Sequence, residues 1–411
     1  MKSCAASPPS RCSRRREEAD TQRNWSTRLL TSAATSVFLA TLVMFGFNSS
    51  AGPLVSELKS DEMIVFYPTL ATPATNGGWN VRVHGCVFEI EKRRLSLAAL
   101  RGALRLDGIK MDASELATFK ERARLFFADN ERGHRVVARI GEETFDLGKS
   151  APNGHFQKEV HLAEFPPLVV PALAGLPPRS NQTPDRLKPG LQTYPPFLEI
   201  SAVLKPDDTR KCNGIALVLP ATGVSVISDI DDTIKISDVL NHGALVRRTF
   251  LQPFEAVSGM AEVYRAWAAN GAQFHYVSAS PWQLHLPLLE FTGTNNFPSG
   301  SWHMKQWRLK DRTFRSLFEN PEIYKKETIS PLLRQFPQRH FVLVGDSGER
   351  DPEAYAALAR EFPAQIKAIF IRDVTGQGAD AERYLTNFTG LPRDLWRVFK
   401  EPSEIAPLLK W

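Results

Sequence analysis

Residues 224–235 read VSVISDIDDTIK, an apolar run that ends at Ser228 and is followed at once by aspartates. A short, continuously apolar run next to polar turn residues is typical of a strand that is buried on both faces. Asp229 and Asp231 stand two residues apart, so their side chains point to the same side of an extended chain. Carboxylates this close repel each other, which indicates either a cation that neutralises them or a proton on one of them.

Three more apolar runs follow, at 274–277, 341–344 and 366–371, and segments with helical periodicity separate them. Apolar strands that alternate with helices predict a parallel sheet with helices on both faces, a Rossmann-like α/β fold. In such sheets ligands bind beyond the carboxyl ends of the strands. We therefore predict an α/β domain over residues 213–411, with its site at that edge.

Polar side chains follow the predicted strands at this edge. Ser278 comes after the second run, and the loop GDSGERD, from 345 to Asp351, brings Asp346 after the third. A lysine pair, Lys325 and Lys326, precedes the third run. Acidic clusters with only oxygen donors suit Mg²⁺. A hydroxyl, an ammonium and Mg²⁺ around a carboxylate could hold a phosphate for nucleophilic attack, which gives an acyl-phosphate that water hydrolyses.

Each of these features also has a purely structural interpretation. The DIDDT stretch could be a turn and a helix cap, because Asp and Thr favour caps. Ser278 taken alone could be structural, and Lys325 taken alone could be a solvated start of a helix. Their order along the chain, each near the end of a predicted strand, favours one shared site.

The order DxDxT, strand-final Ser, Lys and GDxxxxD resembles the haloacid-dehalogenase-like phosphohydrolases. More narrowly, three segments look like the catalytic domain of the phosphatidate phosphatase family named for a fungal actin-patch protein. They are VISDIDDTIK at 226–235, YVSASPWQL at 276–284 and FVLVGDSGERDPEAY at 341–355. The resemblance covers about residues 213–400 and implies a haloacid-dehalogenase-like fold.

The resemblance implies the roles of the acidic residues by position. Asp229 would be the nucleophile and a ligand of magnesium. Asp231 would be the general acid for the leaving alcohol and then the base for water, with its backbone carbonyl on the metal. Asp346 would complete the metal site, and Asp351 would bind the metal or orient the site.

The same resemblance implies that Ser278 and Lys325 hold the phosphoryl oxygens. Lys325 is preferred to Lys326 because Lys-x-x-x-Ile, from Lys325 to Ile329, fits the family pattern. A register shifted by one residue is the alternative.

We expect a magnesium-dependent phosphatidate phosphatase that releases diacylglycerol and phosphate through an aspartyl-phosphate at a membrane surface. The alternatives are a phosphatase for soluble or protein-bound phosphomonoesters, and a non-catalytic protein that binds a lipid or a partner. Two intervals of the sequence, the first from Asp229 to Ser278 and the second from Ser278 to Lys325, leave no room for a large folded cap domain. Aromatic residues crowd the second interval and could pack in the core or line an interfacial surface: Trp282, Phe291, Phe297, Trp302, Trp307, Phe314 and Phe318.

Residues 52–212 alternate apolar and polar residues between turn signals, which predicts a β-rich, sandwich-like domain. A helical pattern at 112–129 interrupts these strands. Nine of the 29 prolines fall between 166 and 196, so that segment is predicted to be an extended loop inserted between two strands.

Residues 1–51 combine a basic start with an uncharged, apolar stretch, which predicts a signal peptide or a signal anchor and an exported or membrane-anchored protein. Residues 1–28 carry a net charge of +4 out of +6 for the whole chain. The nearly neutral remainder lacks the basic surface expected of a nucleic-acid-binding protein, so we expect no nucleic-acid partner.

Cys86 and Cys212 both fall in strand-like segments of the β-rich domain. In an exported chain they could form a disulfide, and two buried thiols are the alternative. Their spacing fits no metal site.

Overall fold

The computed structural model describes residues 54–89, 98, 100–102, 104–126, 129–164, 196–306 and 321–408. The predicted signal segment at 1–51 and almost all of the Pro-rich segment at 166–196 lie outside these residues. Residues 52–411 form one compact unit. No helix in the described part of the chain combines the length and the apolar character that crossing a bilayer requires.

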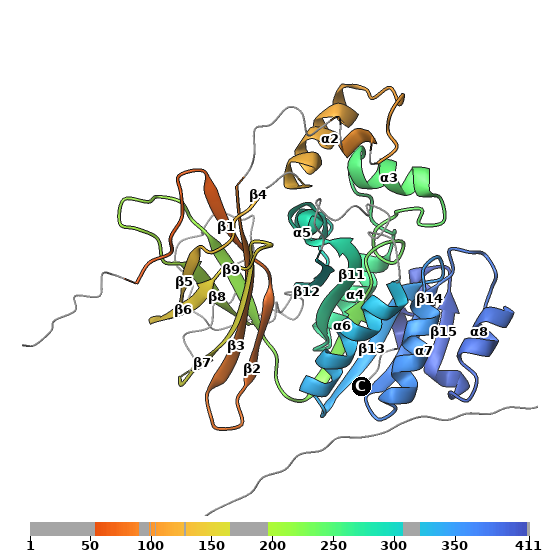
Figure 1. Cartoon of the computed structure of the whole chain (residues 1–411). Coiled ribbons are helices and arrows are strands. Elements are labelled where there is room, and N and C mark those ends of the chain that lie inside the picture. Colours follow the sequence, from red (N-terminus) through yellow and green to blue (C-terminus); the bar gives the residue numbers. More distant parts are fainter. Residues whose placement is uncertain are drawn as a thin grey trace, which may run out of the picture. The chain divides into compact units, whose positions relative to one another are not determined.

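The first part of the described chain is rich in β-strands (Figure 1), as predicted. Within the described residues, hydrogen bonds join nine strands into one largely antiparallel sheet with the main order β1-β3-β2-β9-β8-β5-β6. The strands are β1 (Glu62–Phe66), β2 (Thr69–Pro73), β3 (Trp79–Glu89), β4 (Asp129–Asn130), β5 (Arg135–Ile140), β6 (Glu143–Lys149), β7 (His155–Leu162), β8 (Phe197–Ala202) and β9 (Asn213–Val218). The finer description as a sandwich of two sheets stays a prediction.

Inward-facing side chains of this sheet share one hydrophobic cluster. It includes Ile64 of β1, Val83 of β3, Ala138 of β5, Val160 of β7 and Ile200 of β8. Strands far apart in the order thus contribute to the same core, so the sheet curls around it.

The first domain extends further along the chain than the sequence suggested. β9, which we had assigned to the second domain, pairs in parallel with β2 and antiparallel with β8. The change of sheet therefore lies between Val218 and Gly223. Cys86 and Cys212 are both present as buried thiols, and burial raises the pKa of the Cys86 thiol to about 12.

The predicted helix at 112–129 is α2 (Ala113–Phe126). Its buried face carries Phe119, Ala123 and Phe126, as the helical spacing indicated. These side chains belong to the same hydrophobic cluster as residues of the second sheet. In addition, the Arg122 guanidinium donates hydrogen bonds of 3.3 Å and 2.6 Å to the backbone carbonyls of Arg248 and Thr249.

The second sheet contains six parallel strands among the described residues, in the order β12-β11-β10-β13-β14-β15. They are β10 (Gly223–Ser228), β11 (Gln273–Pro281), β12 (Gly300–Lys305), β13 (Arg339–Asp346), β14 (Ile366–Arg372) and β15 (Trp396–Phe399). The chain runs outward from β10 to one edge and then returns to start at β13, so the order reverses between these two strands. That reversal is where a sheet of this kind opens a crevice for a ligand.

Helices cover both faces of this sheet, as predicted. Neighbouring residues of β10 show this, because Val226 lies in one core cluster and Ile227 in the other. Side chains of α4 and α5 share the cluster of Val226, and those of α6, α7 and α8 share that of Ile227. The helices are α3 (His242–Phe250), α4 (Met260–Ala269), α5 (His285–Thr294), α6 (Pro321–Gln335), α7 (Asp351–Glu361) and α8 (Glu382–Asn387).

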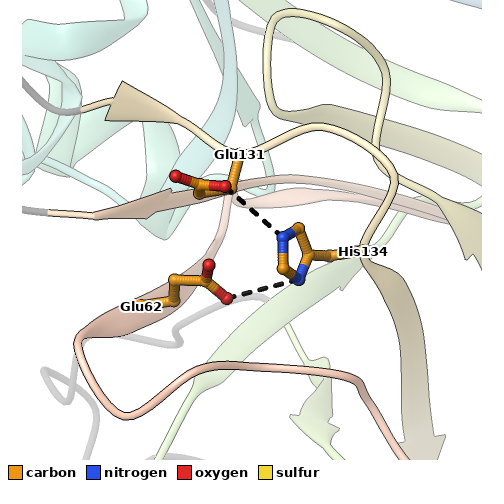
Figure 2. A group of neighbouring side chains, drawn as sticks. All are labelled: Glu62, Glu131 and His134. Atoms are coloured by element: carbon orange, nitrogen blue, oxygen red, sulfur yellow. Dashed lines mark ion pairs between the residues drawn. The ribbon is translucent and has the colours of Figure 1, made fainter.

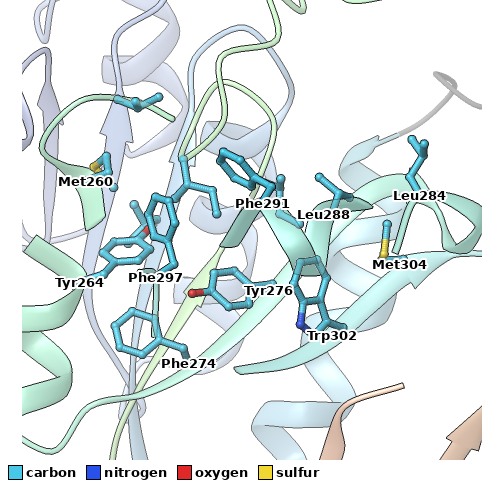
Figure 3. Packing of buried hydrophobic residues seen from close by; sticks show 14 of the residues in the cluster. Met260, Tyr264, Phe274, Tyr276, Leu284, Leu288, Phe291, Phe297, Trp302 and Met304 are labelled. Carbon is cyan, nitrogen blue, oxygen red and sulfur yellow. The ribbon is translucent and has the colours of Figure 1, made fainter. Parts of the chain in front are cut away.

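The aromatic residues that follow Ser278 pack in the core wherever the structure describes them. Trp282, Phe291, Phe297 and Trp302 are all buried. Figure 3 shows Phe291, Phe297 and Trp302 among the side chains of β11, β12, α4 and α5. This confirms the core interpretation for these four residues, whereas Trp307, Phe314 and Phe318 lie outside the described residues.

Candidate active site

The predicted acidic residues meet at the reversal of the strand order. Asp229 follows directly after β10, and Asp346 is the last residue of β13. These strands are neighbours, and the backbone N–H of Asp229 donates a 2.9 Å hydrogen bond to the carbonyl of Val344. Both side chains are buried, with 1% and 0% of their surface exposed. Parallel pairing therefore places two aspartates from distant parts of the sequence at one edge of the sheet.

Lys325 is the lysine that reaches this site. It lies inside α6, which begins at Pro321, before the point where the sequence placed the start of the helix. Its Nζ lies 3.0 Å from Oδ1 of Asp229 and 2.9 Å from Oε2 of Glu349, and it forms an ion pair with Asp351. Burial opposes the charge on this fully buried ammonium, but the three carboxylates raise its pKa well above the ordinary range.

Asp351 contacts the lysine and the backbone of β13. Its Oδ1 is paired with Lys325, and its Oδ2 accepts a 3.1 Å hydrogen bond from the backbone N–H of Asp346. A Cβ on Gly345 would overlap the Asp351 carboxylate, so glycine is needed at that position for the carboxylate to approach the strand. These contacts fit the orienting role that the resemblance offered for Asp351 as an alternative to metal binding.

Glu349 takes the third acidic position beside the two strand-end aspartates. One carboxylate oxygen from each of Asp229, Asp346 and Glu349 can be chosen so that all three lie within 4.8 Å of one another. The sequence analysis did not single out Glu349, although it lies within the GDSGERD loop. Its spacing of three residues from Asp346, at the turn that leads into α7, is the signal that could have identified it.

Two buried carboxylate oxygens in this group lack a hydrogen-bond partner. They are Oδ2 of Asp229 and Oδ2 of Asp346. Oδ1 of Asp346, in contrast, accepts hydrogen bonds of 2.6 Å and 3.0 Å from the backbone N–H groups of Gly348 and Glu349. Burial, together with the neighbouring carboxylates, raises the pKa values of Asp229 and Asp346 well above the ordinary range. Unpartnered carboxylate oxygens with no nitrogen or sulfur ligand beside them fit a hard divalent cation.

Asp231 lies in a different electrostatic environment. Its Oδ1 is 2.8 Å from Nζ of Lys235 and accepts a 2.7 Å hydrogen bond from the Ser237 hydroxyl. Its Oδ2 accepts hydrogen bonds from the hydroxyls of Ser280, at 3.0 Å, and of Ser278, at 3.3 Å. Burial alone would raise the pKa of Asp231, but Lys235 and the hydroxyl donors lower it to about 2.

The structure thus places Ser278 beside Asp231, at the sheet edge where the order of the motifs placed both, and adds partners that the sequence analysis missed. Lys235 and Ser280 lie within the quoted motifs and Ser237 lies two residues after one of them, but no helical or strand periodicity distinguishes these polar side chains from those of other loop residues. The turn of the loop after β10 brings Lys235 and Ser237 to Asp231, and the packing of this loop against β11 adds Ser280.

Asp232 provides the turn that the alternative interpretation of DIDDT expected, but the N-cap of the next helix, α3, is Asn241. Its backbone has a φ of 51°, in the left-handed region. Its carboxylate accepts hydrogen bonds of 2.8 Å, 3.0 Å and 2.7 Å from the N–H groups of Ser237, Asp238 and Val239. The motif therefore contains a structural aspartate in addition to the two that face the site.

A cavity of about 330 Å³ lies beside Asp231 and Glu349. Its apolar wall includes Leu245 and Phe250 of α3, Leu284, and Phe126 of α2. A helix of the β-rich domain thus contributes to the wall of a cavity that adjoins the strand-end acids. This contribution could not be predicted from the sequence.

Comparison with known proteins finds a family model that matches the region containing this site. Residues 224–373 match the family model described as "Phosphatidate phosphatase APP1, catalytic domain". Phosphatidate phosphatase APP1 of Saccharomyces cerevisiae is 35% identical over 162 residues, which are 38% of this chain and 27% of that protein. An uncharacterised protein of Schizosaccharomyces pombe is 35% identical over 161 residues, 38% of this chain and 26% of that protein. The matched region thus spans about a quarter of the length of these relatives.

A solved chain of the Pnkp1/Rnl/Hen1 complex matches with 14% sequence identity and a TM-score of 0.25. That match covers 39% of this chain and 53% of the solved chain. A similarity at this level carries no argument about the fold or the site.

Proposed function

We propose that the chain is a magnesium-dependent phosphatidate phosphatase, because residues 224–373 match the model of the phosphatidate phosphatase APP1 catalytic domain. It would hydrolyse phosphatidate to diacylglycerol and inorganic phosphate. The observation that carries the proposal is the pair of buried, unpartnered carboxylate oxygens on Asp229 and Asp346, beside the ammonium of Lys325. Transfer of a phosphoryl group to a carboxylate requires positive charges that offset the phosphoryl oxygens, and a metal cation together with an ammonium beside the carboxylate would supply them.

Asp229, Asp346 and Glu349 would hold the metal. Among the described residues around this position, four carboxylates (these three and that of Asp351) are balanced by one ammonium, that of Lys325. A divalent cation would offset much of this excess negative charge, and all-oxygen donors favour Mg²⁺ over softer ions. When bound, Mg²⁺ would neutralise phosphoryl oxygens and so stabilise the charge that develops in the transition state.

Asp229 would be the nucleophile in a haloacid-dehalogenase-like course of reaction. A carboxylate oxygen of Asp229 attacks phosphorus, the bond from phosphorus to the glycerol oxygen breaks, and an aspartyl-phosphate forms. Water then attacks phosphorus and releases phosphate, which restores the carboxylate. Lys325, held by Glu349 and Asp351, would balance the charge of the phosphoryl oxygens during both steps.

Asp231 would move the protons. It gives a proton to the departing glycerol oxygen and later accepts one from the attacking water. With a pKa of about 2 it is ionised at rest, so it must gain a proton before the alcohol leaves. The negative charge of a bound phosphate disfavours a neighbouring carboxylate and would raise this pKa, which couples protonation of Asp231 to substrate binding.

The cavity supports a substrate with an apolar part. The side chains of Leu245, Phe250, Leu284 and Phe126 line it next to Asp231, the residue beside which the leaving alcohol would lie. An apolar wall favours diacylglycerol over a small polar alcohol as the leaving group.

Phosphate release tests the proposal directly. The full chain is assayed with Mg²⁺ on phosphatidate in mixed micelles and on p-nitrophenyl phosphate in detergent-free buffer. The variant Asp229→Asn should lose activity on both, because an amide is not a nucleophile toward phosphorus. The control Asp207→Asn changes an exposed aspartate outside the site and should match the wild type.

The outcomes distinguish the candidate functions. Turnover of phosphatidate that Asp229→Asn abolishes supports the proposal and assigns the nucleophile. Turnover of the soluble ester alone assigns the protein to soluble or protein-bound phosphomonoesters instead. No turnover of either substrate by a wild-type chain that binds Mg²⁺ would favour the non-catalytic alternative.

We also propose that residues 1–51 export the protein or hold it at a membrane, where it would meet a lipid substrate. The proposal rests on the basic start and the uncharged apolar stretch from 29 to 51. Fractionation of cells that express the full chain should place it outside the cytoplasm or in the membrane fraction. Recovery in the cytoplasmic fraction alone would contradict this.

A further inference from the structure

A second cluster of possible ligands lies in the nine-stranded sheet, on elements that contribute nothing to the candidate active site. Figure 2 shows the side chains of Glu62, Glu131 and His134 pointing toward one another. Glu62 is the first residue of β1, Glu131 follows β4, and His134 precedes β5. One ligand atom from each lies within 4.8 Å of the others.

The hydrogen bonds of His134 define which ring nitrogen carries a proton. Nδ1 lies 2.8 Å from the backbone carbonyl oxygen of Glu57, and a carbonyl can only accept, so Nδ1 is the donor. In a neutral ring Nε2 then carries a lone pair, and it lies 3.4 Å from Oε2 of Glu131. Two acceptors that face each other repel unless a proton or another cation lies near both.

Glu62 contributes a carboxylate with no exposed surface. Its Oε1 lies 2.7 Å from Nζ of Lys59. Its Oε2 accepts a 2.8 Å hydrogen bond from the backbone N–H of Lys59 and lies 3.3 Å from Nδ1 of His134. The same Nζ lies 3.3 Å from Oε2 of Glu131, so it is held between the two carboxylates. The Lys59 side chain is 60% exposed, whereas that of Glu62 is 0% exposed. The cation here is thus carried by an exposed side chain, while its carboxylate partner is buried.

Acidic side chains outnumber basic ones around this point. Burial, followed by the charges of Asp61 and Glu131, raises the pKa of Glu89, which pairs with Glu62 across β1 and β3. Lys59 supplies one positive charge, and hydrogen bonds to Glu62 and Glu131 raise its pKa. A divalent ion would neutralise this cluster more completely than a single ammonium.

We propose that Glu62, Glu131 and His134 form a binding site for a divalent transition-metal ion, zinc in particular, which takes the place of the Lys59 ammonium. Two carboxylates and one imidazole are a donor set that suits zinc, whereas Mg²⁺ and Ca²⁺ prefer oxygen ligands alone. Water would complete the coordination. The bound ion would fasten the start of β1 to the connection between β4 and β5. The site is independent of the proposed phosphatase activity.

Zinc titration of the full, untagged chain against a chromophoric chelator tests the site. Glu131→Gln and His134→Gln should each weaken one zinc-binding event by at least about tenfold, since even the loss of an outer partner of a ligand costs that much. Asp346→Asn should leave this event unchanged, which separates it from metal binding at the active site. Matched controls are Glu159→Gln and His161→Gln, which change exposed residues of β7 in the same sheet.

Lys59→Met provides the sharpest distinction from an ion-pair cluster that is only structural. If zinc replaces the ammonium, this variant should bind zinc more tightly than the wild type, because a competitor is gone. Because the Lys59 side chain is exposed, its replacement should change the stability of the fold little, so a change in zinc affinity in either direction reports on the site itself. Zinc binding that is the same in wild type and His134→Gln would overturn the proposal, and so would an affinity of Lys59→Met no higher than that of the wild type.

Discussion

Lys325 supplies the positive charge that Asp229, Glu349 and Asp351 share in the described site. Replacing it by Met would keep most of the buried volume but leave these carboxylates without a cation. Removal of one partner of a buried ion pair costs about 3–5 kcal/mol. We expect Lys325→Met to lower the free energy of unfolding by about that amount, out of roughly 5–15 kcal/mol for a typical protein. Urea unfolding at pH 7.5 in EDTA measures this difference.

Lys326→Met is the matched control, because Lys326 is the neighbouring lysine and is only half-buried. It should change the free energy of unfolding by no more than about 0.5 kcal/mol. The deficit of Lys325→Met should shrink at pH 5, because carboxylates that lack their cation take up protons more readily in the folded state than in the unfolded one. Equal stability of the two variants at pH 7.5 would refute the reasoning, and it would reopen the register between the two lysines.

Three further predictions concern the glycine under Asp351, the metal site and a buried histidine. Gly345→Ala would force a Cβ into the Asp351 carboxylate and should cost about 1–3 kcal/mol in urea unfolding, whereas Gly293→Ala meets no atom within 4 Å and should cost nothing; equal effects would contradict this. Asp346→Asn should raise the Mg²⁺ concentration for half-maximal phosphate release at least about tenfold, and an unchanged titration would count against Asp346 as a ligand. Burial lowers the pKa of His285 from 6.5 to about 3, and its ring nitrogens make no hydrogen bond within the described residues. Below pH 6.5 His285 becomes protonated in the unfolded chain but stays neutral in the folded chain. The free energy of unfolding therefore decreases as the pH decreases, by about 1.4 kcal/mol at pH 5.5. Between pH 7.5 and 5.5, His285→Phe should lose less of its free energy of unfolding than the wild type does, by about this amount. An equal loss in both proteins would show that His285 is not its source.

The sequence was sufficient for four of the six described strands of the second sheet, all but β12 and β15, and for the place of Asp229 and Asp346 at its carboxyl edge. Continuous apolar runs separated by helices indicate parallel strands, and polar residues directly after such runs must lie at the carboxyl edge. The periodicity does not say which strands are neighbours. The resemblance implied only that Asp229 and Asp346 share one metal site, and the pairing of β10 with β13 shows that their strands are neighbours.

The same information was insufficient where the choice depends on how a loop turns into a helix. Glu349 and Asp351 both follow β13, and the resemblance assigned a role only to Asp351, which would bind the metal or orient the site. Because α7 begins at Asp351, its carboxylate lies under β13 against Gly345, and Glu349 remains beside the strand-end aspartates. β9 was misassigned for a related reason, since an apolar strand looks the same whether it pairs with β2 or with β10.

The candidate active site has two parts that differ in their balance of charge, one around Asp229 and one around Asp231. Around Asp229, the described acids exceed the one ammonium, and two of their oxygens lack a partner, so this part favours a cation. Asp231 already has Lys235 and hydroxyl donors, so a second cation there would gain little. A phosphate between the two parts would meet the metal and Lys325 on one side and a carboxylate that its own charge helps to protonate on the other. The proposed nucleophile and the proposed acid would therefore take opposite protonation states for different reasons. A metal and Lys325 would keep Asp229 ionised, whereas the charge of a bound phosphate would favour the protonated form of Asp231.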